Sequence, residues 1–359
     1  MAPENQAPKS YDSVTVKKLD GSRIEISASI PTEVWEKFRK QALKNINDSV
    51  TIDGFRKGNV PEAILIAKAG EAAINEEMAE LALSKSYLDI LIDQNIDAIG
   101  KPEVHVTKLA KGNPLEFKAT TEVLPEIKLP DCKAIAGKEL KKSTPDELKV
   151  TDKDVDQAIL RIRKSRVSHE DHDHEKMSPE EHEKAIMDSL PEFNDEFVRG
   201  LGDFKDIEEF KAKVREMVGE GKKDEAREKL RILIADALID AVDFELPELL
   251  IETELKRIEA EFDTDIERMG VKMEDYLKHA KKTIEAIRED WRPHAEKKAR
   301  LQLVLNEIAK KENIKADAKE IEKEVAHIVE HYKDADRERA ALYAETVLTN
   351  EKVFQWLEK

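Results

Sequence analysis

A phenylalanine and two cationic side chains stand between two glycines in the stretch IDGFRKGNVP, residues 52–61. An aromatic ring beside arginine is a combination enriched at the energetic centres of protein interfaces. The Arg56 guanidinium and the Lys57 ammonium could bind phosphates or carboxylates of a partner, while Phe55 could enter an apolar notch. The same pattern also fits an ordinary turn, in which the glycines supply unusual dihedrals, the ring folds back onto the core and the cations are solvated.

A second group of residues has the chemistry of metal ligands. Imidazole and carboxylate groups suit zinc or nickel, and four histidines alternate with acidic residues in one polar tract. Nothing in the tract would orient such ligands, so the sequence favours opportunistic metal affinity over a specific site. No nucleophile motif or glycine-rich phosphate loop occurs, and Cys132 stands alone. We therefore predict no catalytic residues, no metal centre and no cofactor, with one weak metal candidate: His169, His172, His174 and His182.

The overall charge restricts the class of partner. The chain has 359 residues and a formal net charge of −17, which excludes a protein that coats nucleic acid through general electrostatics. Around IDGFRKGNVP the sign inverts, because basic residues outnumber acids between Lys37 and Lys68. One cysteine excludes an internal disulfide, the N-terminal residues lack an apolar signal, and no apolar run is long enough to span a membrane. We expect a cytoplasmic protein without a membrane partner.

The first domain, residues 13–130, is predicted to be α+β and to follow a flexible tail over residues 1–12. SVTVKKL and SRIEISASI alternate apolar and polar residues around a two-residue Asp20-Gly21 turn, and PEVHVTKL and PLEFKATTEV form a second pair of strands. Two amphipathic helices, starting near Pro31 and Pro61, separate the pairs and complete the order ββααββ. The second helix is expected to bury one apolar face, formed by Ile74, Met78, Leu81, Leu88 and Ile92.

The remainder of the chain is predicted to be helical. Residues 131–189 should form a linker with one crossing helix over TDKDVDQAILRIRKS and a solvated tract rich in histidine and acid. In residues 190–359, long charge-rich amphipathic segments predict an extended all-α domain with protruding arms. Helix breaks are expected at RGLGDF, FELPE, RMGVKM, WRPH and KENIKAD.

The loop sequence resembles the ribosome-docking loop of bacterial trigger factors. That family pattern is Gly-Phe-Arg-x-Gly-x-x-Pro. LPEFNDEFVRGLGDF, FELPELLIETELKRI and the segment from Trp291 to Val325 resemble the family's helical domain. The resemblance covers residues 13–168 and 188–359. The docking residues that it implies are Gly54, Phe55, Arg56, Lys57, Gly58 and Pro61.

The resemblance implies a ribosome-associated chaperone that works without ATP. Its partners would be protein and RNA of the large ribosomal subunit near the exit tunnel, together with nascent or unfolded polypeptides. A homodimer stays open. Asn59 stands where the family often has lysine, so one docking cation is missing. The family usually carries an FKBP-type prolyl isomerase domain, for which residues 169–187 leave too little room, so we expect no enzyme activity.

Four residues in a break between two long helices are candidates for client binding: Met269, Val271, Met273 and Tyr276. Ordinary core packing is the simpler interpretation of such apolar residues. If the break forms the tip of an arm, flexible methionines would suit a surface that binds many unfolded segments weakly. The resemblance favours the tip. Two other functions remain open, a ribosome-independent holdase or assembly chaperone and a helical scaffold protein.

Overall fold

The computed structural model describes residues 9–142, 148–167, 179–332 and 335–359, without the side chains of residues 179–182. The chain divides into two compact units. Unit 1 combines residues 1–128 with residues 243–303. Unit 2 combines residues 129–242 with residues 304–359.

A four-stranded antiparallel sheet forms the base of unit 1. Its strands are β1 (Ser13–Leu19), β2 (Arg23–Ile30), β3 (Ala98–Lys108) and β4 (Leu115–Val123), in the spatial order β1-β2-β4-β3. Period-two burial explains the strands, because alternate residues of β2 and β4 face the core. The core residues of these two strands are Ile24, Ile26, Ala28, Ile30, Leu115, Phe117 and Ala119.

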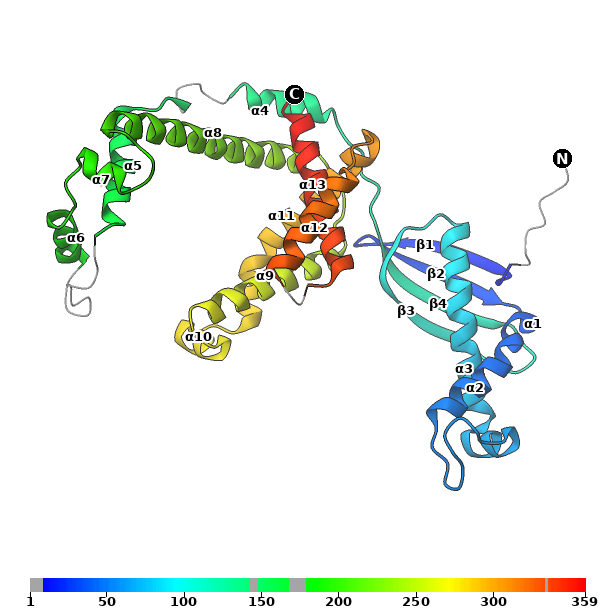
Figure 1. Ribbon diagram of the computed structural model, residues 1–359. Coiled ribbons are helices and arrows are strands. Elements are labelled where there is room, and N and C mark those ends of the chain that lie inside the picture. Colours follow the sequence, from blue (N-terminus) through cyan, green and yellow to red (C-terminus); the bar gives the residue numbers. More distant parts are fainter. Residues whose placement is uncertain (1–8, 143–147, 168–178, 333–334) are drawn as a thin grey trace. The chain divides into compact units, whose positions relative to one another are not determined.

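Helices cover the buried face of this sheet. After α1 (Thr32–Trp35) and the 3₁₀ turn η1 (Glu36–Phe38) come α2 (Arg39–Ser49) and α3 (Glu62–Asp93), and α3 lies across the sheet (Figure 1). Ile74, Met78 and Ile90 of α3 are almost fully buried against the strands. The predicted order ββααββ and the α+β class of this region are therefore confirmed.

The local details of the first domain differ from the predictions in three ways. The first hairpin turn has three residues rather than two, because Leu19 pairs with Arg23. The helix expected after Pro31 is interrupted by η1, and α3 is kinked at Gly70, where φ is +84°. Leu88 and Ile92 are not on the buried face of α3, because in this part of the helix the buried residues are Ser86, Tyr87 and Ile90.

A helical hairpin completes unit 1. Helices α9 (Glu248–Arg268), α10 (Met273–Ala280) and α11 (Ile284–Lys311) follow one another, and α9 packs antiparallel to the first half of α11. Ion pairs join Arg288 to Glu252 and Arg292 to Glu248, both at 2.6 Å. The break predicted at WRPH is wrong, because α11 continues through Pro293. These ion pairs before the proline, a further pair between Lys298 and Glu254 after it, and the buried Ala295 outweigh one lost backbone hydrogen bond.

The base of this hairpin contacts the sheet. Glu245 accepts a hydrogen bond from the Gly21 amide at 2.7 Å, and the Ser22 hydroxyl donates to the Glu245 carbonyl at 2.6 Å. The Leu249 amide at the start of α9 donates to the Glu122 carboxylate at 2.9 Å. The acid therefore satisfies an otherwise unpaired amide at the positive end of the helix.

Unit 2 is helical throughout its described residues. It contains the C-terminal part of α11, from Val304, together with α4 (Cys132–Leu140), α5 (Asp152–Lys164), α6 (Pro179–Asp188), α7 (Asp195–Arg199), α8 (Ile207–Asp240), α12 (Ala318–His331) and α13 (Arg337–Leu357). Thr151 and Asp154 form a capping box that starts α5, the helix predicted from the sequence. Residues 131–189 contain α4 and α6 in addition to this helix: α4 buries Cys132 and Ala136, and Glu183 of α6 forms an ion pair with Lys164 of α5.

Hydrophobic clusters and ion pairs hold unit 2 together, including a cluster of Val325, Ala340 and Ala344 between α12 and α13. Around α5, α7 and α8, Val155, Ile159, Val198, Phe210 and Val214 are buried. Near the other end of α8, guanidinium and carboxylate groups tie α8 to α13. No helix of the described residues is both long and apolar enough to cross a membrane.

Candidate docking loop and arm tip

The segment IDGFRKGNVP forms the connection between α2 and α3, and we call residues 52–61 the docking loop. Asn47, near the end of α2, holds the C-terminal part of the loop, where the chain returns to the domain. The Asn47 side chain donates to the Val60 carbonyl at 3.0 Å and accepts from the Val60 amide at 3.1 Å. The Asn47 carbonyl accepts from the Gly58 amide at 3.1 Å. Three hydrogen bonds to one residue therefore fix where the loop leaves the domain.

The glycines have the role predicted for them. Gly54 and Gly58 have φ values of +87° and +83°, a region that other residues rarely adopt. At Gly58 an added Cβ would also lie 3.0 Å from an Asp48 carboxylate oxygen. Backbone bonds from Phe55 to Ile52 and from Asn59 to Arg56 close two successive turns.

The side chains at the tip of the loop point into solvent. Phe55 is 37% exposed and does not belong to the core cluster, whereas Val60 at the foot of the loop is 5% exposed. Arg56 and Lys57 are exposed, and neither side chain makes an ion pair or hydrogen bond with the part of the chain that the structure describes. The loop therefore presents one aromatic ring and two uncommitted cations.

Not all cations of the predicted basic region are available. Arg39 on α2 forms a bidentate pair with Glu71 on α3, with N···O distances of 2.9 and 2.8 Å. This pair raises the pKa of Arg39 and lowers the pKa of Glu71, chiefly through the hydrogen bonds between them. Arg39 thus fastens the two helices that carry the loop, while Arg56 and Lys57 remain at its tip.

The four residues proposed for the arm tip lie together at the end of the α9–α11 hairpin. Met269 ends α9 and is 70% exposed, and Val271 is 39% exposed. Met273 and Tyr276 on α10 are half-buried. The Tyr276 ring packs edge-on against Phe262 with ring centroids 5.3 Å apart. Met269 and Val271 are thus exposed enough to contact a client, whereas Tyr276 packs α10 against α9.

The candidate metal cluster cannot be described. His169, His172 and His174 lie outside the described residues, and for His182 only the backbone of α6 is described. Elsewhere in the described ranges, no group of three potential ligands is arranged to hold a metal ion.

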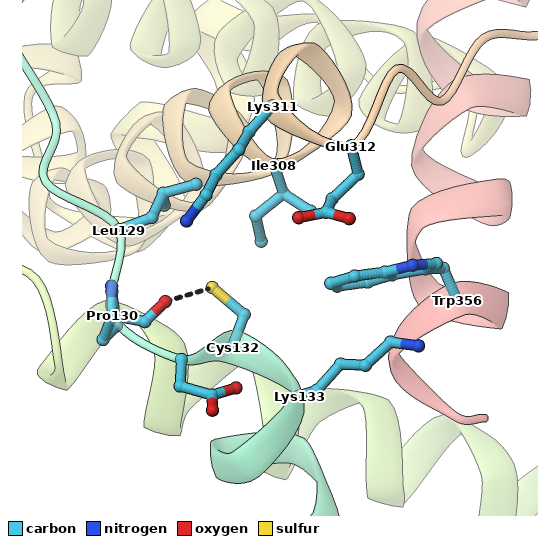
Figure 2. A pocket seen from close by; sticks show the side chains of 9 residues that line it. Leu129, Pro130, Cys132, Lys133, Ile308, Lys311, Glu312 and Trp356 are labelled. Carbon is cyan, nitrogen blue, oxygen red and sulfur yellow. Dashed lines mark hydrogen bonds between the residues drawn. The ribbon is translucent and has the colours of Figure 1, made fainter.

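Cys132 lies in a pocket of unit 2 with a volume of about 470 Å³ (Figure 2). Lys133 places its ammonium 4.5 Å from the centre of the Trp356 ring, and Lys311 and Ile308 line the opposite side. Burial raises the pKa of the Cys132 thiol, which disfavours the nucleophilic thiolate. The sulfhydryl lies 3.5 Å from the Pro130 carbonyl oxygen, and the nearby carboxylates of Asp131 and Glu312 also raise its pKa.

Sequence reasoning missed Asn47. Its role depends on Val60, thirteen residues away, so no local motif reports it. The one available signal was an asparagine near a helix end, a position where the amide often bonds to backbone groups of the following loop.

The comparisons with known proteins agree with this geometry. The family model of the bacterial trigger factor protein matches residues 13–162, and the model of the bacterial trigger factor C-terminus matches residues 206–358. The chain belongs to the trigger factor family. No model of a peptidyl-prolyl isomerase domain matches it.

Individual trigger factors are similar along most of their length. That of Halalkalibacterium halodurans is 24% identical over 403 residues, covering 91% of this chain and 92% of the relative. That of Carboxydothermus hydrogenoformans is 25% identical over 406 residues, covering 92% and 94%. Both alignments are longer than this chain of 359 residues, so these trigger factors contain residues without a counterpart here.

A solved structure supports the fold. It was described for promiscuous substrate recognition in the folding and assembly activities of the trigger factor chaperone. Its TM-score with this chain is 0.57 at 18% identity, and the match covers 97% of this chain and 99% of the other. The α+β first domain and the helical remainder are therefore those of a trigger factor, and the chain is a chaperone of that family.

Proposed function

We propose that this chaperone docks on the large ribosomal subunit, near the exit of the nascent chain, through the docking loop. The observation that carries the proposal is the state of the loop tip: Arg56 and Lys57 are exposed and unpaired beside a 37% exposed Phe55. Side chains with no partner in the described chain are free to bind one outside it.

The chemistry of the tip fits a surface of protein and RNA. The planar Arg56 guanidinium can form two parallel hydrogen bonds with a carboxylate or phosphate, while the Lys57 ammonium acts as a point charge. The Phe55 ring would fill an apolar notch between such charges. Because the contact is partly ionic, its affinity should fall with rising salt.

Docking would let weak client contacts suffice. Tethering raises the effective concentration of the chaperone at emerging chains, so modest apolar patches can compete with premature collapse. Met269 and Val271, exposed at the arm tip, are the patch we assign to client segments. Such capture is driven by apolar burial and needs no nucleotide, so the proposed cycle is independent of ATP.

The proposal includes no prolyl isomerase activity. Between the two matched segments lie residues 163–205. Phe193, Phe197 and Phe204 within that interval pack on the α5–α7–α8 cluster, so they belong to the helical unit. Residues 168–192 remain, fewer than the roughly 40 residues below which a domain usually needs a metal or disulfide to fold.

Ribosome co-sedimentation tests the docking proposal. A variant with Phe55, Arg56 and Lys57 replaced by alanine should lose most of its binding while its melting curve is unchanged, because all three side chains are exposed. A control variant, Lys17→Ala with Lys18→Ala, removes the same charge from exposed positions on β1. Equal binding by wild type and the triple variant would refute docking through the loop and favour a holdase that acts away from the ribosome.

A further inference from the structure

A groove lined by apolar side chains runs between α3 and β3 of the first domain. Its volume is about 780 Å³, and its lining includes Leu83 and Leu88 from α3 and Val104 and Val106 from β3. The two valines are two residues apart, so they share one face of the strand. A volume in the range of roughly 300–1,000 Å³ suits a ligand of a few side chains rather than a folded domain.

Several of these apolar side chains are exposed without a partner. Leu88 is 58% exposed, Val106 44% and Val104 38%. β3 is an edge strand, since among the described residues it pairs only with β4 and no further strand lies along its free edge. Contiguous apolar exposure beside a concave surface is typical of an interaction site.

Charge identifies the occupant. Glu76 and Glu80 lie on the rim, one helical turn apart on α3, and neither side chain has a partner among the described residues. Two like charges at this spacing repel and weaken a helix slightly, so the fold gains nothing from them. A cationic side chain bound between them would relieve the repulsion.

The two ends of the groove also differ in charge. α3 ends at Asp93 and β3 begins at Ala98, so the C-terminal end of α3 adjoins the start of β3. Lys101 therefore lies towards the Leu88 end of the groove, while Glu76 and Glu80 rim the other end. An occupant with a basic residue at one end would bind in one direction.

We propose that this groove is a second polypeptide-binding site, which takes an apolar segment of an unfolded chain with a lysine or arginine beside Glu76 and Glu80. The site is separate from the arm tip and does not depend on the docking loop. It would give the chaperone a preference for unfolded segments that combine apolar and basic residues.

Fluorescence anisotropy with two labelled ten-residue peptides tests the proposal on the full chain. Both peptides alternate leucine and serine, and one ends in two arginines where the other ends in two glutamates. The wild type should prefer the arginine peptide by about fivefold, the range expected for partly exposed charge pairs. Reversing the rim with Glu76→Lys and Glu80→Lys should reverse that preference.

The apolar contribution has a matched control on the same helix. Leu88→Ser with Val106→Thr should weaken binding of the arginine peptide by about tenfold, the effect of losing partial burial of two apolar side chains. Ile92→Ser changes a residue that is 77% exposed and does not line the groove, so binding should be unchanged. Thermal melting monitors the fold of each variant.

Two outcomes would overturn the proposal. One is equal peptide binding by the groove variant and the Ile92→Ser control, or a charge preference that the rim reversal leaves unaltered. The other is a wild-type dimer in sedimentation that the groove variant alone dissociates, because the occupant would then be a second copy. The Phe55/Arg56/Lys57 alanine variant should bind the peptide normally, so failure of ribosome docking would be seen separately.

Discussion

At the scale of single residues, Asn47 shows how the docking loop depends on a side chain outside it. The glycines at positions 54 and 58 could be predicted from the sequence, because a positive φ restricts the residue type locally. Asn47 could not, because its importance arises only when the chain returns at Val60. The exposure of Phe55 was likewise open, since the sequence also allowed the ring to fold onto the core.

Replacing Asn47 with alanine should weaken the docking function without removing any docking residue. The buried Val60 amide would lose its acceptor, which should lower the free energy of unfolding by about 1–3 kcal/mol. A loosened loop should also bind ribosomes more weakly. Denaturant unfolding and co-sedimentation measure the two effects. Asn45→Ala is the control, because Asn45 bonds to Glu77 at 2.7 Å and does not contact the loop. Similar ribosome binding by both variants would show that the loop needs no such anchor.

At the scale of elements, packing decided several features that periodicity did not. The helix expected to break at Pro293 continues because carboxylates of α9 form ion pairs with Arg292 before the proline and with Lys298 after it. Leu88 and Ile92 fit the apolar spacing of α3, yet they are exposed, because Ser86, Tyr87 and Ile90 are the residues that this part of the helix buries. By contrast, the strands and the start of α5 followed from alternation and capping residues, which are local signals.

The contact between α8 and α13 predicts acid sensitivity. Hydrogen bonds from Arg231 lower the pKa of Glu351 from its usual 4.5 to about 2. A carboxyl with a lowered folded-state pKa stabilises the fold fully above its unfolded pKa, and the contribution is lost as pH falls from 4.5 towards 2. Glu351→Gln should therefore cost about 1 kcal/mol at pH 7, a discounted value because the side chain is 38% exposed, and almost nothing near pH 2.

Denaturant unfolding at about pH 7, 4 and 2.5, which spans that window, would measure the difference. Glu345→Gln serves as the control, since Glu345 is exposed on the same helix and has no partner among the described residues. A destabilisation by Glu351→Gln that stays constant across this pH range would contradict the assignment.

At the end of the α9–α11 hairpin, we expect different substitutions to affect client binding and stability. Met269→Ser with Val271→Ser should reduce the suppression of aggregation of a diluted unfolded protein, while unfolding changes by less than about 0.5 kcal/mol per exposed site. Tyr276→Ser should instead destabilise the hairpin by about 1–2 kcal/mol, because it removes the ring contact with Phe262. Unimpaired suppression by the double variant would move the client surface away from this tip.

At the scale of the whole molecule, the two segments that match the trigger factor family, residues 13–162 and 206–358, are separated by only a short interval. The family could be predicted from the sequence alone, because the motifs of the loop and of the helical segments are specific to it. The division into two compact units was not accessible in the same way. Residues 243–303 group with the first domain through contacts such as Glu245 to Gly21, which join positions more than two hundred residues apart.

The short interval predicts the absence of one activity. A protease-coupled assay with a proline-containing peptide should show only the uncatalysed isomerisation rate in the presence of the chain, because residues 168–192 are fewer than the roughly 40 that usually fold without a metal or disulfide. A trigger factor with an isomerase domain provides the positive control. Acceleration that persists after repurification and is lost on deleting residues 168–192 would show that this interval is catalytic.

Site-specific photo-crosslinking tests the central claim most directly. A photoreactive phenylalanine analogue at position 55, in an otherwise unchanged chain, should crosslink to a component of the large ribosomal subunit at the nascent-chain exit, and the yield should fall with rising salt. The same analogue at position 92, which is exposed but outside the docking loop, should give no such product. Equal crosslinking from both positions, or none from position 55 on saturating ribosomes, would contradict docking through the loop.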